Sequence, residues 1–404
     1  MADRMSIAQE AQTPFGTGVQ RFSEPRVRIL RLDFLMLVSA LGLIAFSLIT
    51  LNGATAADVP GSPDYFVTRQ GIYALVGLVA MVALAAIDYS RFRELRAGLY
   101  VAMMALIVMV LGLGGVTRGS RRWIELPFFR FQPSELGKVL LVLSLSAFVI
   151  DRLRRVSDRD VTSRIMLLAL APTLLVMVQP DIGTGIVYLT IALALLFVAG
   201  TKWTHFAALA ALATTAALLV LVVAPMAGAP VLKGYQKDRL TAFLNKDSAD
   251  PRSQGYQLKQ AEIAIGSGRK TGRGTQRATQ TRLDFLPESR TDFVFAVVGE
   301  QYGFVGAGIV LSLYALLIWR ALRILTIAKN LYGALIAAGI GAMLMTQVFV
   351  NVGGNVGIMP ITGIPLPLMS YGGSSVIVTL IALGILQSVY VQAREAAASK
   401  LEGI

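Results

Sequence analysis

Long apolar runs and short polar connections alternate along the chain from about residue 30 to residue 392. Runs of roughly 18–20 residues with few charges recur, and each is long enough to cross a ~30 Å hydrocarbon core as a helix. The runs are continuous instead of alternating in polarity, so they favour helices over the strands of a barrel. We therefore expect an all-α polytopic membrane protein with about ten spans, near residues 30–51, 67–87, 99–114, 132–150, 165–179, 182–200, 204–227, 291–319, 331–351 and 370–392.

The distribution of Lys and Arg among the short connections predicts the orientation of these spans. With the N-terminus in the cytoplasm, the segments on that side hold 19 Lys and Arg residues, and the short loops on the other side hold four. Both termini are therefore expected in the cytoplasm. We expect a disordered tail over 1–28, a transmembrane domain over 29–395 and a cytoplasmic C-terminal tail over 396–404.

One connection, residues 228–290, is far longer than the others and is expected outside the cytoplasm between the seventh and eighth spans. Loops of this length are uncommon unless they are functional. Within it, the stretch from Tyr256 to Ile265 is compatible with a short interfacial helix.

Composition excludes several classes of site. The 404 residues are 55% hydrophobic and 15% charged, with no cysteine and a single histidine, His205. Disulfides, thiolate metal sites and multi-histidine metal sites are therefore unavailable. The net charge of +13 fits cytoplasmic loops that face anionic lipid. We expect no nucleic-acid partner, because the basic residues are scattered without a recognisable reader module.

With the predicted orientation, four polar clusters meet on the outer side of the membrane. They are residues 121–138, 179–185, the junction at Asp292, and 351–375. Prolines and glycines interrupt the helices there, and irregular backbone near membrane depth is tolerated only inside protein or along a wet cavity. The sequence thus predicts an outward-facing cavity with acidic residues at its floor and arginines at its rim, which suits an anionic ligand.

Asp292 and Glu300 stand at and just inside the start of a membrane helix. Ionisable groups at that depth are costly, so their default interpretation is a functional site. A structural interpretation stays open for each. Asp292 is also a good N-cap residue, and Glu300 could pair with a neighbouring helix.

The remaining candidates also have structural alternatives. Trp123 fits an aromatic belt, and Glu135 and Lys138 could neutralise each other three residues apart on one helix. Asp181 could cap the sixth span. The segment 370–373 could be a turn. Arg121 and Arg122 could face lipid headgroups, although a phosphate ligand accounts better for arginines on the disfavoured side.

Five motifs together resemble the SEDS family of shape, elongation, division and sporulation proteins, which includes RodA and FtsW. They occur in the family's order and read RWI…QPSELGK, QPDIGTG, DP-x-x-x-GYQ…IAIGSG, FLPE-x-x-TDFVFAVVGE and GIPLPLMSYGGSS. Two departures stand beside them. Arg290 occupies the position where the family often has His, and Arg-Lys-Thr-Gly-Arg-Gly follows IAIGSG in place of a less basic stretch.

The resemblance implies a peptidoglycan glycosyltransferase that polymerises lipid II on the outer face of the bacterial cytoplasmic membrane. The GIMPITGIPLPLMSYGG passage and the short N-terminal tail favour the RodA branch over FtsW. The implied partners are a class B penicillin-binding protein and other membrane proteins of the elongation complex. The chemistry leaves room for a divalent cation, Mg²⁺ or Mn²⁺, and for no organic cofactor.

By the resemblance, Asp292 is the essential carboxylate, acting as general base, metal ligand or orienter of the acceptor sugar. The other expected residues bind substrate or shape the site: Arg122, Trp123, Glu135, Lys138, Asp181, Thr291, Glu300, Ser370, Tyr371, Gly372 and Gly373. Two rival functions stay open from the residues alone. One is a transporter that flips the lipid-linked precursor, and the other is a non-catalytic scaffold for a cell-wall transpeptidase.

Overall fold

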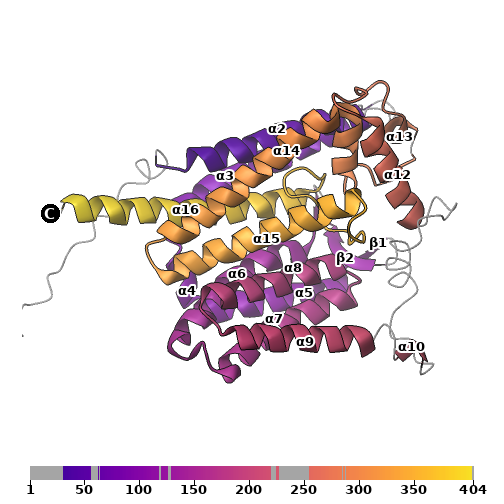
Figure 1. The fold of residues 1–404 in the computed structure, drawn as a ribbon. Coiled ribbons are helices and arrows are strands. Elements are labelled where there is room, and N and C mark those ends of the chain that lie inside the picture. Colours follow the sequence, from indigo (N-terminus) through magenta and orange to yellow (C-terminus); the bar gives the residue numbers. More distant parts are fainter. Residues whose placement is uncertain are drawn as a thin grey trace, which may run out of the picture.

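The computed structural model describes residues 31–55, 62, 64–117, 120–125, 129–219, 224–226, 254–283, 285–286 and 288–402. The predicted tail over 1–28 and the first part of the predicted outer loop, 228–253, lie outside the described residues. Most of the described chain is helical, and the long helices run roughly alongside one another in one bundle (Figure 1).

Ten apolar helices make up the bundle in the described ranges. Seven are long and apolar enough to cross a membrane: α2 (Phe34–Thr55), α3 (Tyr65–Ala86), α6 (Pro133–Asp151), α7 (Arg159–Val178), α14 (Val294–Ile327), α15 (Leu331–Asn355) and α16 (Gly373–Glu402). Three apolar helices are shorter: α5 (Arg96–Leu113), α8 (Ile182–Val198) and α9 (Trp203–Leu218). The expected integral membrane architecture is thus supported. Several boundaries are shifted by a few residues, and α14 and α16 extend eight and ten residues beyond their predicted ends.

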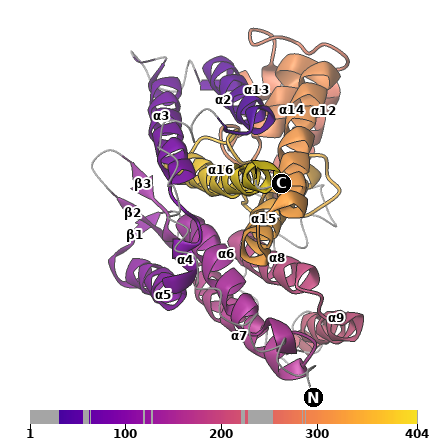
Figure 2. The same cartoon turned by 90° about the vertical axis from the view of Figure 1, so that its left-hand side faces the viewer.

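The core lies where α6, α15 and α16 meet. Between 72% and 83% of the apolar window of each of these helices is buried inside the protein. Figure 2 shows α16 close to end-on, with α3, α2, α14, α15 and α6 around it. The other long helices expose many large apolar side chains, such as Leu75 and Val79 on α3 and Leu174 on α7, as expected for surfaces that face lipid.

The remaining elements are short and connect the long helices. Two short helices lie at the end of the bundle where α16 terminates, α4 (Arg91–Glu94) and the 3₁₀ helix η1 (Leu153–Arg155). The opposite end carries three short helices and three strands: α10 (Ala224–Met226), α12 (Gln254–Ser267), α13 (Thr279–Arg282), β1 (Gly115–Thr117), β2 (Ser120–Glu125) and β3 (Arg130–Phe131). We call this second end the sheet end.

The three strands are absent from the all-α prediction. They form a small antiparallel sheet in the order β1-β2-β3, with Gly115 opposite Trp123 and Ile124 opposite Phe131. This segment is too polar to continue the membrane helices on either side of it. Strand pairing satisfies its backbone instead, and it fixes the directions in which Arg122 and Trp123 leave the backbone.

Helix α14 also differs from the prediction, which placed a single helix over 291–319. The backbone of Gly303 is non-helical, with φ 65° and ψ −158°, so α14 consists of two half-helices. The basic stretch after α12 enters the gap and pairs with both cut ends. The four bonds run from Arg273 N to Glu300 O (2.9 Å), Gly274 N to Gln301 O (3.0 Å), Phe304 N to Arg269 O (2.9 Å) and Val305 N to Lys270 O (3.0 Å).

Glycine is required on both sides of this gap. A Cβ on Gly272 would lie 2.1 Å from the carbonyl oxygen of Gln301, and a Cβ on Gly303 would lie 2.3 Å from the amide nitrogen of Gly272. Both glycines also adopt positive φ values, which other residues adopt only at a cost. The half-helix nearer the sheet end, residues 294–302, therefore begins beside Asp292 and ends against the loop.

Candidate functional site

The backbone around Asp292 is held by hydrogen bonds from the last turns of α15 and from the segment that links α15 to α16. Three consecutive carbonyl oxygens, those of Arg290, Thr291 and Asp292, accept these bonds. The donors are Tyr371 N to Arg290 (2.8 Å), Ser370 Oγ to Thr291 (2.6 Å), and the side-chain amides of Asn351 and Asn355 to Asp292 (3.1 and 2.9 Å). This arrangement fixes the peptide units that flank Asp292, so its side chain leaves a rigid backbone.

Asp292 is half-buried and precedes Phe293, which occupies the N-cap position of α14. The structural alternative for Asp292 was that it is the N-cap of this helix. In the structure it lies one residue before the N-cap. Asp292 lines a cavity of about 10 Å³, room for roughly one water molecule. The cavity is lined by Asp292, Phe293, Val350, Asn351, Gly354, Asn355, Ile361, Thr362, Gly363 and Ile364.

The segment 370–372 is itself anchored to α3. Gln70, which is buried, donates from its side-chain amide to the carbonyl oxygen of Ser370 (3.1 Å) and accepts from the amide of Gly372 (3.3 Å). On the other side, Thr291 donates to a carboxylate oxygen of Glu288 (3.1 Å). The predicted turn at 370–373 is thus the piece that holds Thr291 and Asp292 in place.

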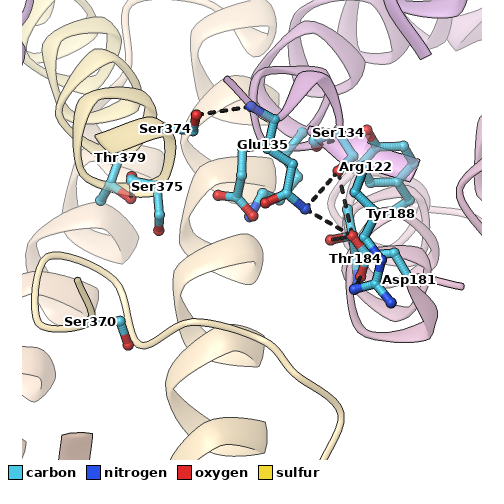
Figure 3. A network of polar contacts seen from close by, with 12 residues as sticks. Arg122, Ser134, Glu135, Asp181, Thr184, Tyr188, Ser370, Ser374, Ser375 and Thr379 are labelled. Atoms are coloured by element: carbon cyan, nitrogen blue, oxygen red, sulfur yellow. Dashed lines mark hydrogen bonds and ion pairs between the residues drawn. The ribbon is translucent and has the colours of Figure 1, made fainter. Parts of the chain in front are cut away.

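A second polar network surrounds Asp181 (Figure 3). Asp181 caps α8 by accepting from the amide of Thr184 (3.2 Å), as its structural alternative predicted. Its Oδ2 also accepts from the Thr184 hydroxyl (2.9 Å) and from the side-chain amide of Gln132 (3.0 Å). Because the carboxylate is 2% exposed, these bonds replace the water that it loses.

Glu135 and Lys138, which lie one turn apart on α6, form a buried ion pair. Lys138 Nζ lies 2.7 Å from Glu135 Oε1, and both side chains are 2% exposed. The structural alternative for these two residues, that their charges neutralise each other, therefore matches an ion pair in the structure. Figure 3 shows Glu135 between the Asp181 network and Ser374.

The N-terminus of α16 connects the Asp181 network to the Asp292 junction. The Ser374 hydroxyl donates to the carbonyl oxygen of Arg130 (2.9 Å) and accepts from the amide of Gln132 (2.9 Å). Only three residues separate Ser374 from Ser370, which holds Thr291. The structure thus places three of the four predicted clusters along one short segment, 370–374.

Arg122 extends from β2 toward the remaining cluster, residues 179–185. The Arg122 guanidinium donates to the carbonyl oxygen of Gln179 (2.9 Å) and to that of Pro180, and it lies 4.0 Å from Asp181. These bonds hold the irregular turn before α8, where Pro180 has φ 33°. Trp123 is half-buried. Phosphate binding by Arg122 and substrate binding by Trp123 stay predictions.

Glu300 lies apart from the Asp181 network. Its carboxylate is fully buried and accepts from the amides of Gln280 (2.8 Å) and Thr281 (3.1 Å) and from the Thr281 hydroxyl (2.7 Å). Glu300 therefore anchors α13 against residues 294–302 of α14. This contact matches the structural interpretation of Glu300, with the short helix α13 as its partner.

Four residues that hold the site were not singled out from the sequence: Gln70, Gln132, Asn351 and Asn355. The pair Asn351 and Asn355 carries the clearest signal, because amides four residues apart lie on one face of a helix. Two such amides deep in an apolar span need partners. Asn355 finds them in the Asp292 carbonyl and in the amide of Ala296 (3.1 Å).

A metal ion remains compatible with these residues, although no group of three His, Asp or Glu side chains surrounds one point in the described ranges. Mg²⁺ bound to phosphate substrates commonly uses one or two protein carboxylates. Asp292 together with substrate oxygens is such a donor set.

Comparison with known proteins gives the family. The model of the FtsW, RodA and SpoVE family, described as "Cell cycle protein", matches residues 28–395. The chain is 37% identical over 366 residues to peptidoglycan glycosyltransferase MrdB of Escherichia coli K12, covering 89% of this chain and 93% of that protein. It is 34% identical over 363 residues to stage V sporulation protein E of Bacillus subtilis, covering 88% and 96%.

Solved structures agree. A chain from a complex described as "Structural coordination of polymerization and crosslinking by a peptidoglycan synthase complex" matches with a TM-score of 0.75 at 31% identity, covering 90% of this chain and 98% of that chain. The rod shape determining protein RodA of Thermus thermophilus matches with a TM-score of 0.64 at 28% identity, covering 89% and 96%. The match to the family model over residues 28–395 and the identity to MrdB show that the chain belongs to the SEDS family of FtsW, RodA and SpoVE proteins.

Proposed function

We propose that this protein is a peptidoglycan glycosyltransferase that polymerises lipid II, an undecaprenyl-linked disaccharide pentapeptide, into glycan strands. Polymerisation takes place on the outer face of the bacterial cytoplasmic membrane and serves cell elongation, as in RodA. The observation that carries the proposal is the clamped junction at Asp292, where three consecutive carbonyls are fixed and Asp292 lines a small cavity. Relatives named peptidoglycan glycosyltransferase support it.

Glycosyl transfer requires a sugar hydroxyl to lose its proton while its oxygen attacks an anomeric carbon. In this proposal the Asp292 carboxylate takes that proton as general base. The new bond joins the hydroxyl oxygen to the anomeric carbon. The bond from that carbon to the lipid diphosphate breaks, and its electron pair leaves with undecaprenyl diphosphate. The fixed backbone contributes by keeping the base in position before substrate arrives.

A divalent cation, Mg²⁺ or Mn²⁺, fits the same site. Asp292 and the diphosphate oxygens would hold it, and it would supply positive charge to the leaving group. No other part of the proposal depends on it, and no organic cofactor is required.

The topology proposed for the bundle has ten spans with both termini in the cytoplasm. The ten apolar helices support the count, and the bias of Lys and Arg supports the orientation. The sheet end then faces outward with α12 and α13. The likeness to a chain from a complex that coordinates polymerisation and crosslinking supports a class B penicillin-binding protein as partner, together with other membrane proteins of the elongation complex.

The test uses purified full-length protein with lipid II in detergent micelles, with and without a class B penicillin-binding protein, followed by sizing of the glycan. We expect chains from the wild-type protein and none from Asp292→Asn at an unchanged melting temperature. Asp158→Asn, which alters an exposed ion pair with Arg155, is the matched control and stays active. Full activity of Asp292→Asn removes Asp292 from the mechanism. No product from any variant removes the polymerase function.

A precursor flippase is the second candidate, and the broken helix α14 favours it, because interrupted helices are common in transporters. The two functions separate by compartment. A polymerase makes chains in micelles, whereas a flippase acts only when two leaflets are present. Within the polymerases, a division role is the alternative, since the chain is also 37% identical over 370 residues to a probable FtsW of Thioalkalivibrio sulfidiphilus. Rescue of a strain depleted of its elongation polymerase, but not of its division polymerase, supports the elongation role.

A further inference from the structure

We infer that the basic segment 269–277, between α12 and α13, binds the anionic headgroups of phospholipids at the membrane surface. In the topology proposed above, this surface is that of the outer leaflet. The segment contains the stretch Arg-Lys-Thr-Gly-Arg-Gly, which departs from the family pattern and has no role in the proposed reaction. The inference concerns lipid binding and does not depend on polymerase activity.

The exposed apolar surface of α14 begins at the break in this helix. Every residue from Val294 to Gln301 is buried, whereas Phe304 is 78% exposed and Val305 is 54% exposed. The first exposed charged side chain beyond them is Arg323, nineteen residues after Phe304. At the rise of a helix this length is about 29 Å, which matches the ~30 Å of a hydrocarbon core. Phe304 therefore marks the level where the lipid-facing surface of α14 meets the headgroups.

Helix α2 lies beside α14 and gives the same level. The Tyr302 hydroxyl donates to the carbonyl oxygen of Ile49 (3.5 Å), and Ile49 is the last exposed large apolar residue on α2. The exposed residue that follows it is the polar Asn52. A Cβ on the next residue, Gly53, would lie 2.4 Å from the side chain of Thr275. The basic segment thus meets both helices where their exposed surfaces change from apolar to polar.

Backbone hydrogen bonds fix the segment at this level. The carbonyl oxygens of Arg269 and Lys270 accept from the amides of Phe304 and Val305, the first two amides of the half-helix 304–327. Both basic side chains are exposed. They therefore leave the backbone beside the first lipid-facing side chains of α14, where long basic side chains extend to the phosphates of the headgroups.

The positive charge of this region is not balanced by acids. From Arg269 to Arg282 the sequence has five Lys and Arg residues and no Asp or Glu. Within the ranges that the structure describes, no carboxylate forms an ion pair with Arg269, Lys270 or Arg277. Basic residues held at a membrane surface attract anionic lipids through this kind of unbalanced charge.

A phospholipid matches this surface more completely than a free anion does. Its phosphate contacts the basic side chains, and its acyl chains cover the apolar residues that begin at Phe304. A free phosphate makes only the first of these contacts. An anionic headgroup, such as that of phosphatidylglycerol, also has the net charge that zwitterionic phosphatidylcholine lacks. Lipid bound in this way holds the segment against both cut ends of α14.

The experiment measures hydrogen exchange of full-length protein in phosphatidylcholine nanodiscs, with and without phosphatidylglycerol. The amides of Arg273, Gly274, Phe304 and Val305 bond across the break, so lipid bound to the segment slows their exchange. We expect phosphatidylglycerol to slow it about fivefold or more in the wild-type protein, and high salt to weaken the effect.

The double variant Arg269→Gln with Lys270→Gln should lose the effect of phosphatidylglycerol. The exchanged pair, Arg269→Lys with Lys270→Arg, keeps both charges and should retain it. If the double variant melts early, Arg277→Gln tests the same charge from an exposed position that makes no bond to α14, and we expect it to weaken the effect. The matched control removes two exposed charges at the opposite end of the bundle, Arg154→Gln with Arg159→Gln, and should behave as the wild type does.

Three results would overturn the inference. The first is an unchanged effect of phosphatidylglycerol in the double variant or in Arg277→Gln. The second is equal slowing by inorganic phosphate in nanodiscs of phosphatidylcholine alone, which would show a site for a free anion. The third is an unchanged lipid effect combined with lost binding of a class B penicillin-binding protein, which would show a docking site for protein. Because no arm measures glycan synthesis, failure of the proposed function would leave the lipid result intact.

Discussion

The hydroxyl of Ser370 donates a 2.6 Å hydrogen bond to the carbonyl oxygen of Thr291, 79 residues earlier in the chain. Ser370 Oγ also accepts from the amide of Leu366 (2.8 Å), and Ser370 is 1% exposed. We predict that Ser370→Ala lowers the free energy of unfolding by about 1–3 kcal/mol, because it leaves two buried backbone groups without a partner. Turnover of lipid II should fall as well, since the peptide unit before Asp292 loses its anchor.

Thermal melting and turnover per folded molecule measure these two effects separately. Ser399→Ala, on the exposed part of α16, is the control and should change neither. An active Ser370→Ala protein with wild-type melting would show that this bond does not hold the junction.

Glu300→Gln is predicted to destabilise the protein without slowing the chemistry. The Glu300 carboxylate accepts three hydrogen bonds from Gln280 and Thr281. In glutamine, an NH2 group replaces one of these carboxylate oxygens. This buried NH2 donor then faces a donor of Gln280 or Thr281. We expect a loss of about 1.5–3 kcal/mol, measured by thermal melting, at nearly unchanged turnover per folded molecule. Thr281→Val should cost less, and the double variant should cost less than the sum. A large loss of turnover at wild-type stability would place Glu300 in the chemistry.

Breaking the pair between Glu135 and Lys138 is predicted to cost more than removing it. Lys138→Met leaves the Glu135 carboxylate buried without its ion-pair partner, and Glu135→Gln removes the charge that Lys138 needs. We expect each to lower stability by about 3–5 kcal/mol. The double variant Glu135→Gln with Lys138→Met should recover much of that loss. Chemical denaturation in detergent gives the comparison. Additive losses in the double variant would mean that the pair is not coupled.

Gly303→Ala is predicted to loosen the contact between α14 and the outer loop. Alanine is strained at φ 65° and ψ −158°, and its Cβ would lie 2.3 Å from the amide nitrogen of Gly272. The backbone cost is about 1–3 kcal/mol. Hydrogen exchange should therefore speed up at the amides of Phe304 and Val305, which bond to the loop. Gly308→Ala, where an added Cβ meets nothing within 4 Å, is the matched control. Unchanged exchange in Gly303→Ala would contradict the role of the gap.

The pH dependence is predicted from Tyr371, which lies in the segment before α16. Burial is the main cause that raises the pKa of its hydroxyl to about 12, from an ordinary value of 10.0. The folded state thus keeps the proton longer than the unfolded state. Its contribution to stability is complete below pH 10 and is lost as the pH rises from 10 toward 12. We expect Tyr371→Phe to leave the shape of the pH–rate profile between pH 6 and 9 unchanged. Loss in this variant of an inflection that the wild type shows between pH 6 and 9 would contradict the raised pKa, because it would show that Tyr371 titrates in that range.

Apolar periodicity and charge bias were enough to predict the helical bundle and its approximate spans. They work because each membrane helix must satisfy its own backbone and must be apolar along its length. The same physics explains the convergence of polar clusters on the sheet end. Membership of the SEDS family, which the five motifs implied, is confirmed by the match over residues 28–395.

The sequence did not predict the features that depend on contacts between distant segments. The three short strands follow from pairing across 115–131. The break in α14 requires the loop at 269–274 to occupy it, and nothing local marks Gly303 apart from Gly306 and Gly308. Glu300 turned out to bind α13, because only the folded loop brings the amides of Gln280 and Thr281 to it.

Because α14 is broken at Gly303 and the loop bonds to both cut ends, the direction of residues 294–302, next to Asp292, is set separately from that of residues 304–327. Residues 294–302 are bonded to the loop at 269–274 and, through the amide of Ala296, to Asn355 of α15, whereas residues 304–327 pack through Ala321 against Gly341 of α15 and pair through Arg320 with Asp33. A bilayer of different thickness would tilt residues 304–327 and leave the orientation of the Asp292 carboxylate unchanged. A single unbroken helix would transmit every such tilt to the reacting groups.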